Sequence, residues 1–313
     1  MSSAREHTLG AQPTHSVWNR DLAPRLMIAP GDVVHMECVD SSGAQVRPGF
    51  TLADFLAIDR MKIHALTGPI AIEGAQPGDV LQVDVLEVAH KGWAWSSVIA
   101  GLGFLDGRFT EPYFFEWKLD GDVSTSLAPA VVPLRPFCGV MGLAQAEMGA
   151  FRTRPPGAFG GNMDVRELSA GATLYLPVMV EGGLFSAGDA HAAQGDGEVC
   201  INGMECPADV TLRLGLHKQR HLAGPMVESA ARRGEDGPEW IVVESGIEAL
   251  TTAQTATSRL VDLLVDRWGF EPVQAYLLCS VAMKLRLSQV VNRPMVTVSA
   301  AIAKSVLPER RLF

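Results

Sequence analysis

Alternation of apolar and polar positions predicts β-strands along most of the chain. In residues 80–88, Val83 and Val85 flank Asp84, and this period of two places apolar side chains on one face of a strand. The same pattern predicts further strands at residues 25–29, 33–39, 70–72, 131–140, 173–180, 210–216, 240–244 and 295–299. Glycines and prolines fall between these runs, which is typical of strands joined by turns.

Apolar residues at every third or fourth position predict helices in three segments. Residues 252–268 and 272–287 carry this spacing near the C-terminus. Gly269 is expected to end the first of these helices, and Pro272 to begin the second. A helix is also predicted at residues 52–63, where it would cover one end of a sheet.

The order of these elements predicts a fold that is mainly β, with an α+β C-terminal portion. The β-rich part spans about residues 15–245 and the α+β part about residues 246–313, with no clear linker between them. Residues 1–14 are expected to form a flexible lead-in. Residues 92–121 are rich in aromatic side chains and glycines, which predicts an irregular segment. Its aromatic residues either pack in the core or line a pocket.

Composition narrows the class of protein. A chain of 313 residues with a net charge of -9 and no dense Lys/Arg run is a poor candidate for nucleic-acid binding. Five cysteines without CxxC spacing argue against a disulfide framework and suit a reducing compartment. The polar N-terminal residues lack an apolar signal core, and no apolar run is long enough to span a membrane. We therefore expect a soluble, cytoplasmic protein.

The densest set of candidate catalytic side chains lies in residues 188–198. Asp189 and His191 stand two residues apart, so in an extended segment both would face one point. Asp196 and Glu198 repeat this spacing after Gly195. Mixed carboxylate and imidazole groups suit zinc or a harder divalent ion, and a carboxylate outside the ligand set can take a proton from water. The alternative is a solvated acidic loop with one histidine.

Other candidate residues lie in two more stretches. Asp164 follows a Gly-Gly-Asn turn that permits close approach of the backbone, and Asn162 in that turn either donates to a carbonyl oxygen or caps the turn. Glu73 is either a buried general base beside the metal or an exposed acid at the end of a strand. His64 is either a substrate-binding or a structural histidine.

Familiar catalytic motifs of other enzyme classes are absent from the sequence. There is no Gly-x-Ser-x-Gly elbow, no phosphate-binding loop ending in Gly-Lys-Ser, and no His-Glu-x-x-His. Cys138 has no neighbour in the sequence that would activate it, so we interpret it as a small buried residue.

Several motifs, taken in order, resemble the acetamidase/formamidase family over about residues 30–298. They are Thr67-Gly-Pro-Ile70, Glu73-Gly-Ala75, Pro77-Gly-Asp79, Pro136-Phe-Cys-Gly139, Pro155-Pro-Gly157, Gly160-Gly-Asn-Met-Asp164, Gly188-Asp-Ala-His191 and Gly195-Asp-Gly-Glu198. The resemblance implies a β-sandwich-like fold, a metal-dependent hydrolase of small linear amides, and a homodimer or higher homo-oligomer. It implies a metal held by Asp164, Asp189 and His191, and acidic motif positions at Glu73, Asp196 and Glu198. The sequence departs from the family pattern at His64 and in residues 92–121.

The resulting hypothesis is hydrolysis of a small amide to a carboxylate and ammonia by a metal-activated water, with Glu198 favoured over Glu73 as the base. The metal is expected to be zinc, with manganese, iron and calcium left open. One alternative is a hydrolase of lactams or bulkier aryl amides. Another is a non-catalytic binding protein that the metal stabilises.

Overall fold

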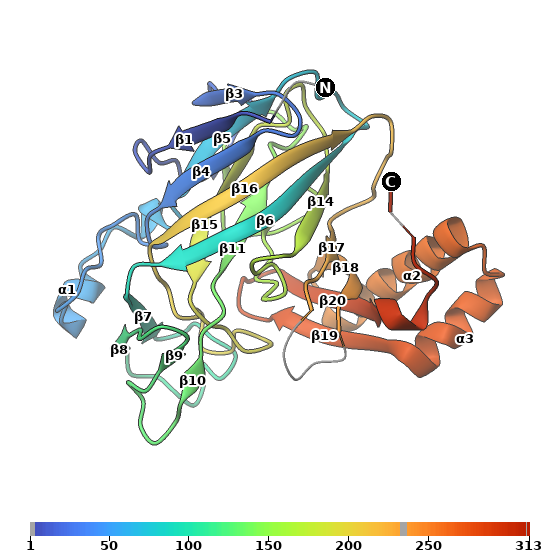
Figure 1. The fold of residues 1–313 in the computed structure, drawn as a ribbon. Helices are drawn as coiled ribbons and strands as arrows, with labels where there is room; N and C mark the ends of the chain where they lie inside the picture. The colour runs from blue at the N-terminus through green and yellow to red at the C-terminus, as the bar shows by residue number, and fades with distance from the viewer. Residues whose placement is uncertain (1–3, 232–236, 311) are drawn as a thin grey trace.

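Two β-sheets form the larger part of the fold (Figure 1), and the computed structural model describes residues 4–231, 237–310 and 312–313. Within these residues the larger sheet has nine strands in the order β1 (Glu6–Leu9), β4 (Val33–Cys38), β16 (Ala208–His217), β6 (Val80–His90), β14 (Thr173–Pro177), β17 (Met226–Glu228), β18 (Glu239–Gly246), β20 (Val296–Ala303) and β19 (Met283–Gln289). The smaller sheet has the order β13 (Gly160–Asn162), β11 (Phe137–Gly142), β15 (Phe185–His191), β5 (Leu66–Ile72) and β3 (Leu26–Ile28). The predicted strands are thus present, except that the one predicted at residues 131–140 is two separate strands, at residues 132–133 and 137–142. The predicted sandwich-like, mainly β fold is confirmed.

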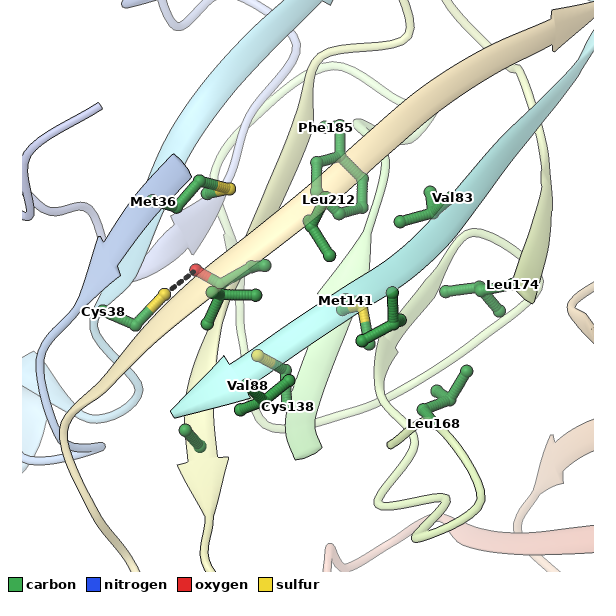
Figure 2. Packing of buried hydrophobic residues seen from close by; sticks show 14 of the residues in the cluster. Met36, Cys38, Val83, Val88, Cys138, Met141, Leu168, Leu174, Phe185 and Leu212 are labelled. Carbon is green, nitrogen blue, oxygen red and sulfur yellow. Dashed lines mark hydrogen bonds between the residues drawn. The ribbon is translucent and has the colours of Figure 1, made fainter. Parts of the chain in front are cut away.

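The main hydrophobic core lies between these two sheets (Figure 2). Val83 of β6 and Leu212 of β16 come from the large sheet, and Met141 of β11 and Phe185 of β15 come from the small one. All four are fully buried or nearly so, and burial of each such side chain contributes about 1.5–3 kcal/mol. Cys138 packs in this core as predicted: hydrogen bonding to Cys38 and burial raise the pKa of its thiol, so it is not an activated nucleophile.

Two helices cover the C-terminal half of the large sheet, at the lower right of Figure 1. α2 (Ala249–Trp268) packs on β18 and β20, and α3 (Pro272–Ala282) follows it. Gly269 ends α2 in the left-handed conformation at φ 74°, and Pro272 opens α3, as predicted. Because β18, β19 and β20 belong to the large sheet, the C-terminal portion shares that sheet with the rest of the chain.

The predicted helix at residues 272–287 is too long. Residues from Met283 onward form β19, which pairs with β20. Lys284 and Arg286 both form ion pairs with the buried Glu239, at 2.9 and 2.7 Å. The strand places these two cations on one face, and this long-range pairing outweighs the local helical spacing.

The N-terminal prediction is also corrected. Residues 6–9 form β1, which pairs in parallel with β4, so the expected flexible lead-in over residues 1–14 is wrong for this stretch. Asp32 accepts hydrogen bonds from the Arg5 backbone and from His7, which fixes β1 at the sheet edge. Residues 1–3 of that lead-in lie outside the described residues.

Residues 92–121 are more regular than expected, because much of the segment forms a hairpin of β7 (Trp93–Val98) and β8 (Tyr113–Lys118). Trp95 and Phe114 of this hairpin pack with Phe55. Phe55 lies on α1 (Leu52–Leu56). Residues 57–59 separate α1 from the 3-10 turn η1 (Arg60–Lys62), and Asp59 is the N-cap of that turn. The single helix predicted at residues 52–63 is therefore two short elements.

All five cysteines are free. Four short strands form two further pairs. β2 (Val17–Trp18) pairs with β12 (Phe151–Arg152), and β9 (Val123–Ser124) pairs with β10 (Val132–Pro133). Among the described residues, no helix has the length and apolar character needed to cross a bilayer.

Candidate active site

Strand β15 carries the two residues that the sequence placed on one face. Asp189 and His191 are both buried, and His191 Nε2 lies 3.7 Å from Asp189 Oδ1. β15 pairs with β11 as far as His191 and with β5 as far as Gly188, and Asp189 itself has a positive φ of 55°. The first half of residues 188–198 thus belongs to a central strand, and the two side chains meet there although Asp189 departs from extended geometry.

Asp164 reaches the same point from the turn after β13. Gly160 and Gly161 hold positive φ values of 90° and 86°, which lets this strand lie close against β11. Opposite it, Gly139 leaves room for both carboxylates: a Cβ there would lie 2.5 Å from Asp164 Oδ1 and 3.0 Å from Asp189 Oδ2. The two aspartates therefore pack over a position without a side chain.

Two glutamates complete the group. Glu198 Oε1 lies 3.9 Å from His191 Nε2, and Glu205 Oε1 lies 2.9 Å from the same atom. Glu205 was not among the residues predicted from the sequence. Its one local signal is an acidic residue between Met204 and Cys206, both buried, on a segment whose backbone bridges β15 at His191. We name the set Asp164, Asp189, His191, Glu198 and Glu205 the acidic centre.

Donor atoms of the acidic centre converge closely enough to bind a cation. One ligand atom from each of Asp164, Asp189 and His191 lies within 4.8 Å of the others, and the same holds for His191, Glu198 and Glu205. Among the described residues, Asp189 Oδ1, His191 Nε2 and Glu205 Oε2 are buried without a hydrogen-bond partner. The short contact between His191 and Glu205 lacks hydrogen-bond geometry. Buried polar atoms without partners are costly, so these atoms fit ligands of a metal ion.

Gln194 fixes the orientation of the His191 ring. Its side-chain nitrogen donates to the backbone oxygens of Asp164 at 2.9 Å and Ser288 at 3.2 Å, so its oxygen is left to accept from His191 Nδ1 at 2.8 Å. Hydrogen bonding at Nδ1 directs the lone pair of Nε2 toward the acidic centre. This is the arrangement that commonly supports a metal-binding histidine.

Two asparagines hold the aspartates. Asn292 donates to Asp164 Oδ2 at 2.6 Å. With its amide nitrogen facing the carboxylates, Asn162 donates to Asp189 Oδ2 at 3.1 Å and Asp164 Oδ1 at 3.3 Å, and its oxygen accepts from Asn292 at 2.9 Å. Asn162 thus positions the carboxylates from β13. Asn292 was not predicted, because its segment before Pro294 has only the composition of an ordinary turn.

Burial and crowding shift the pKa values of the acidic centre strongly. Burial raises the pKa of Asp164 and that of Glu205 to about 7, and burial and the charge of Asp164 raise the pKa of Glu198. Burial alone would lower the pKa of His191, but the charges of Glu205 and Asp189 raise it well above its usual range. So many buried acids need protons or a cation to offset their charge.

Backbone conformation also marks this centre. Asp164, Asp189 and Glu198 have positive φ values of 50°, 55° and 47°, and they are three of the seven non-glycine residues with positive φ within the described parts of the chain. Residues held in this sparsely populated region cost about 1–3 kcal/mol each and cluster at functional sites. The fold maintains these conformations where the carboxylates meet.

A cavity of about 560 Å³ opens above the acidic centre, and Asp189, Glu198 and Glu205 form part of its lining. Both residues predicted to bind substrate, His64 and Asn162, also line it. Burial lowers the pKa of His64, whose Nδ1 has no hydrogen-bond partner among the described residues. Residues 92–121 contribute an apolar wall of Trp95, Ile99 and Leu102, and Trp95 both packs against Phe55 and lines the cavity.

Two predicted catalytic residues are not brought to the centre. Asp196 forms an ion pair with Arg166 at 2.8 Å, and its side chain is 45% exposed. It diverges from Glu198 because Glu198 lies in a turn with positive φ, not in a strand. Glu73 is exposed just beyond the end of β5, whereas Leu66 at the start of that strand pairs beside Asp189. Seven residues of strand separate it from the centre by about 20 Å, so the buried-base hypothesis for Glu73 is wrong.

The packing over Gly139 makes a prediction. Gly139→Ala is expected to displace the Asp164 and Asp189 carboxylates and to lower kcat/KM for the amide hydrolysis that the family resemblance implies, about tenfold to hundredfold. The control is Gly215→Ala, where the nearest atom would lie 3.5 Å from the added Cβ. The kcat/KM and the melting temperature of both variants are measured. Equal kcat/KM values for Gly139→Ala and Gly215→Ala would contradict the proposed role of Gly139.

Comparison with known proteins gives a consistent family. The model of the Acetamidase/Formamidase family matches residues 2–148 and 144–308. The chain is 30% identical to a formamidase from Methylophilus methylotrophus over 65% of this chain and 64% of that protein, and 25% identical to an acetamidase from Mycolicibacterium smegmatis over 86% and 85%. The crystal structure of an acetamidase from Bacillus halodurans superposes with a TM-score of 0.88 at 29% identity, covering 96% of this chain and 98% of that one. These names agree with the predicted enzyme class. The chain belongs to the acetamidase/formamidase family.

Proposed function

We propose that this protein hydrolyses a small amide to a carboxylate and ammonia at the acidic centre. The observation that carries the proposal is the convergence of buried acids and His191 at the floor of a cavity, in a chain of this family. In the reaction the carbon–nitrogen bond breaks and a bond forms between the carbonyl carbon and the oxygen of water. One water proton must reach the leaving nitrogen, so the site needs a group that accepts and returns a proton.

A divalent metal ion held by Asp164, Asp189 and His191 belongs to this proposal. The fit rests on the partnerless Asp189 Oδ1 and His191 Nε2 and on the excess of buried negative charge. Oxygen donors with one imidazole suit zinc, and manganese or calcium accept such a set as well. When bound, the ion would supply Lewis acidity to the amide carbonyl and acidity to water.

Glu198 is the residue we assign as the base. It lies at the floor of the cavity, 3.9 Å from His191 Nε2, and burial and the charge of Asp164 raise its pKa, which makes its carboxylate a stronger base. It would accept a proton from the attacking water and donate it to the departing nitrogen. Glu205 lies at hydrogen-bond distance from His191 and offers a further oxygen for the cation. His64 lines the cavity beside Asp189 and can contact the bound amide.

Release of ammonia from formamide, acetamide and larger amides tests this function. Purified protein supplied with zinc, manganese or calcium is expected to release ammonia and the matching carboxylate in equal amounts. A lactam and an anilide in the same panel test the alternative substrates. A folded protein that releases no ammonia from any of these amides with any of the ions would overturn the proposal.

A further inference from the structure

The cavity above the acidic centre is larger than its simplest substrates require. Its volume is about 560 Å³, within the roughly 300–1,000 Å³ of pockets that bind drug-sized molecules. Formamide or acetamide would fill a small part of it. The chemistry of the other lining residues therefore indicates which further chemical group the substrate has besides the amide.

Three arginines line this cavity. Arg60 comes from η1, Arg152 is the last residue of β12, and Arg154 follows two residues later. The pKa of the Arg154 guanidinium is lowered, first by burial and then by the positive charges of Arg152 and Arg60. The three guanidinium groups are therefore near neighbours that repel one another, in a protein whose net charge is -9.

These three arginines lack a carboxylate in direct contact. Among the residues that the structure describes, no carboxylate forms an ion pair with Arg60, Arg152 or Arg154. Arg60 lies over the Phe55 ring at 4.8 Å, and Arg152 contacts Met61 Sδ at 3.4 Å. By contrast Arg293, which lines the same cavity, forms an ion pair with Asp106 at 3.0 Å. Like charges gathered without a partner at a cavity wall fit the binding of an anion.

We propose that the physiological substrate is an amide that carries a carboxylate, which Arg60, Arg152 and Arg154 bind while the amide group lies at the acidic centre. This inference rests on the proposed function and adds the class of substrate. Arginine suits the role, because its planar guanidinium binds a carboxylate through paired hydrogen bonds. Glu198 and Arg154 line the same cavity of about 560 Å³, so the two subsites share one enclosed space and a short chain between amide and carboxylate fits it. A monoamide of a short dicarboxylic acid has this form, and its hydrolysis gives the dicarboxylate and ammonia.

A second explanation for the arginines is that they only balance the charge of the acidic centre. The charge of Glu198 raises the pKa of the Arg154 guanidinium, whereas burial is what lowers the pKa of Arg60, and Arg152 is exposed. A purely compensating role predicts that an arginine variant loses activity toward neutral and anionic amides in the same proportion. A substrate-binding role predicts that the ratio of activity toward anionic amides to activity toward neutral amides falls.

The experiment compares amides of matched length and different charge. Ammonia release is measured for succinamate against butyramide and for malonamate against propionamide, with glycinamide as the cationic member. Charge-assisted hydrogen bonds predict that kcat/KM for each anionic amide exceeds that of its neutral match about tenfold to hundredfold, and that added salt reduces the difference. Glycinamide is expected to be the poorest substrate.

Arg154→Gln and Arg152→Gln are the informative variants, and Arg213→Gln, exposed on β16, is the matched control. The succinamate-to-butyramide ratio of kcat/KM is expected to fall at least tenfold in each cavity variant and to stay unchanged in the control. Calorimetric binding of succinate, the expected product, gives a readout without turnover and should weaken in the same variants. Arg152 is exposed, so its variant tests the proposal even where Arg154→Gln does not fold.

The outcomes separate the two proposals. Hydrolysis of neutral amides without any preference for succinamate or malonamate would overturn the anion subsite and leave the amidase function standing. A preference that persists in Arg152→Gln and Arg154→Gln would overturn the assignment to these arginines. No ammonia from any amide would overturn the proposed function and this inference with it.

Discussion

Asp189→Asn is expected to lower kcat/KM for amide hydrolysis about 1,000-fold, equivalent to about 4 kcal/mol. Asp189 is the one acid of the centre whose pKa lies below its usual range: burial opposes this, but the charges of His64 and His191 hold it ionised. One of its oxygens has no other partner, so the change removes a charged ligand atom from the centre. The bound metal is expected to be lost with the activity.

The same variant separates an enzyme from a metal-stabilised binding protein. Removal of one negative charge from a crowded acidic centre relieves repulsion, so the melting temperature without added metal should stay close to that of the unaltered protein. Asp196→Asn is the matched control. Its exposed ion pair with Arg166 predicts a change in kcat/KM of less than about fivefold. A large loss of stability with turnover within tenfold of normal would favour a structural role for the metal.

Glu198→Gln is expected to lower kcat about 100-fold to 10,000-fold, the usual contribution of a general base. The glutamine side chain introduced at this position cannot accept a proton from water, but its size and its burial match those of the glutamate. Because the proposed ligands Asp164, Asp189 and His191 are intact, metal content and KM are expected to change little. This combination differs from that of Asp189→Asn, in which metal and activity fall together.

Glu73→Gln is the control for that measurement, because it makes the same chemical change at an exposed position about 20 Å from the centre. Its kcat is expected to equal that of the unaltered protein. Loss of metal from Glu198→Gln would show that Glu198 is a metal ligand. A normal kcat in that variant would assign the role of base to Glu205, which also lines the cavity.

Local sequence patterns correctly predicted the features that depend on neighbouring residues alone. The period of two along residues 80–88 gave β6, and the Gly269 and Pro272 signals gave the helix boundaries. Their spacing also placed Asp189 and His191 together, and the two side chains meet on β15 although Asp189 has a positive φ. Asp164 was a candidate because of its glycine-rich turn and because of the family resemblance, although no local rule connects that turn with β15.

Features that depend on distant segments were missed or wrong. Met283 and the residues after it form a strand because they pair with β20 and contact Glu239, which no helical period can reveal. Glu205 joins the acidic centre through a backbone bridge to β15, and Asn292 reaches Asp164 from 128 residues away. Asp196 was placed with Glu198 by spacing, but the positive φ values of Gly197 and Glu198 direct the two side chains apart.

The central claim is that the acidic centre holds a metal ion required for amide hydrolysis. Elemental analysis of the purified protein, together with ammonia release before chelation, after chelation and after return of the ion, tests it most directly. The account predicts at least one divalent ion per chain, loss of turnover on its removal, and recovery when the same ion is restored. Full turnover by a folded protein verified to be free of metal would contradict it.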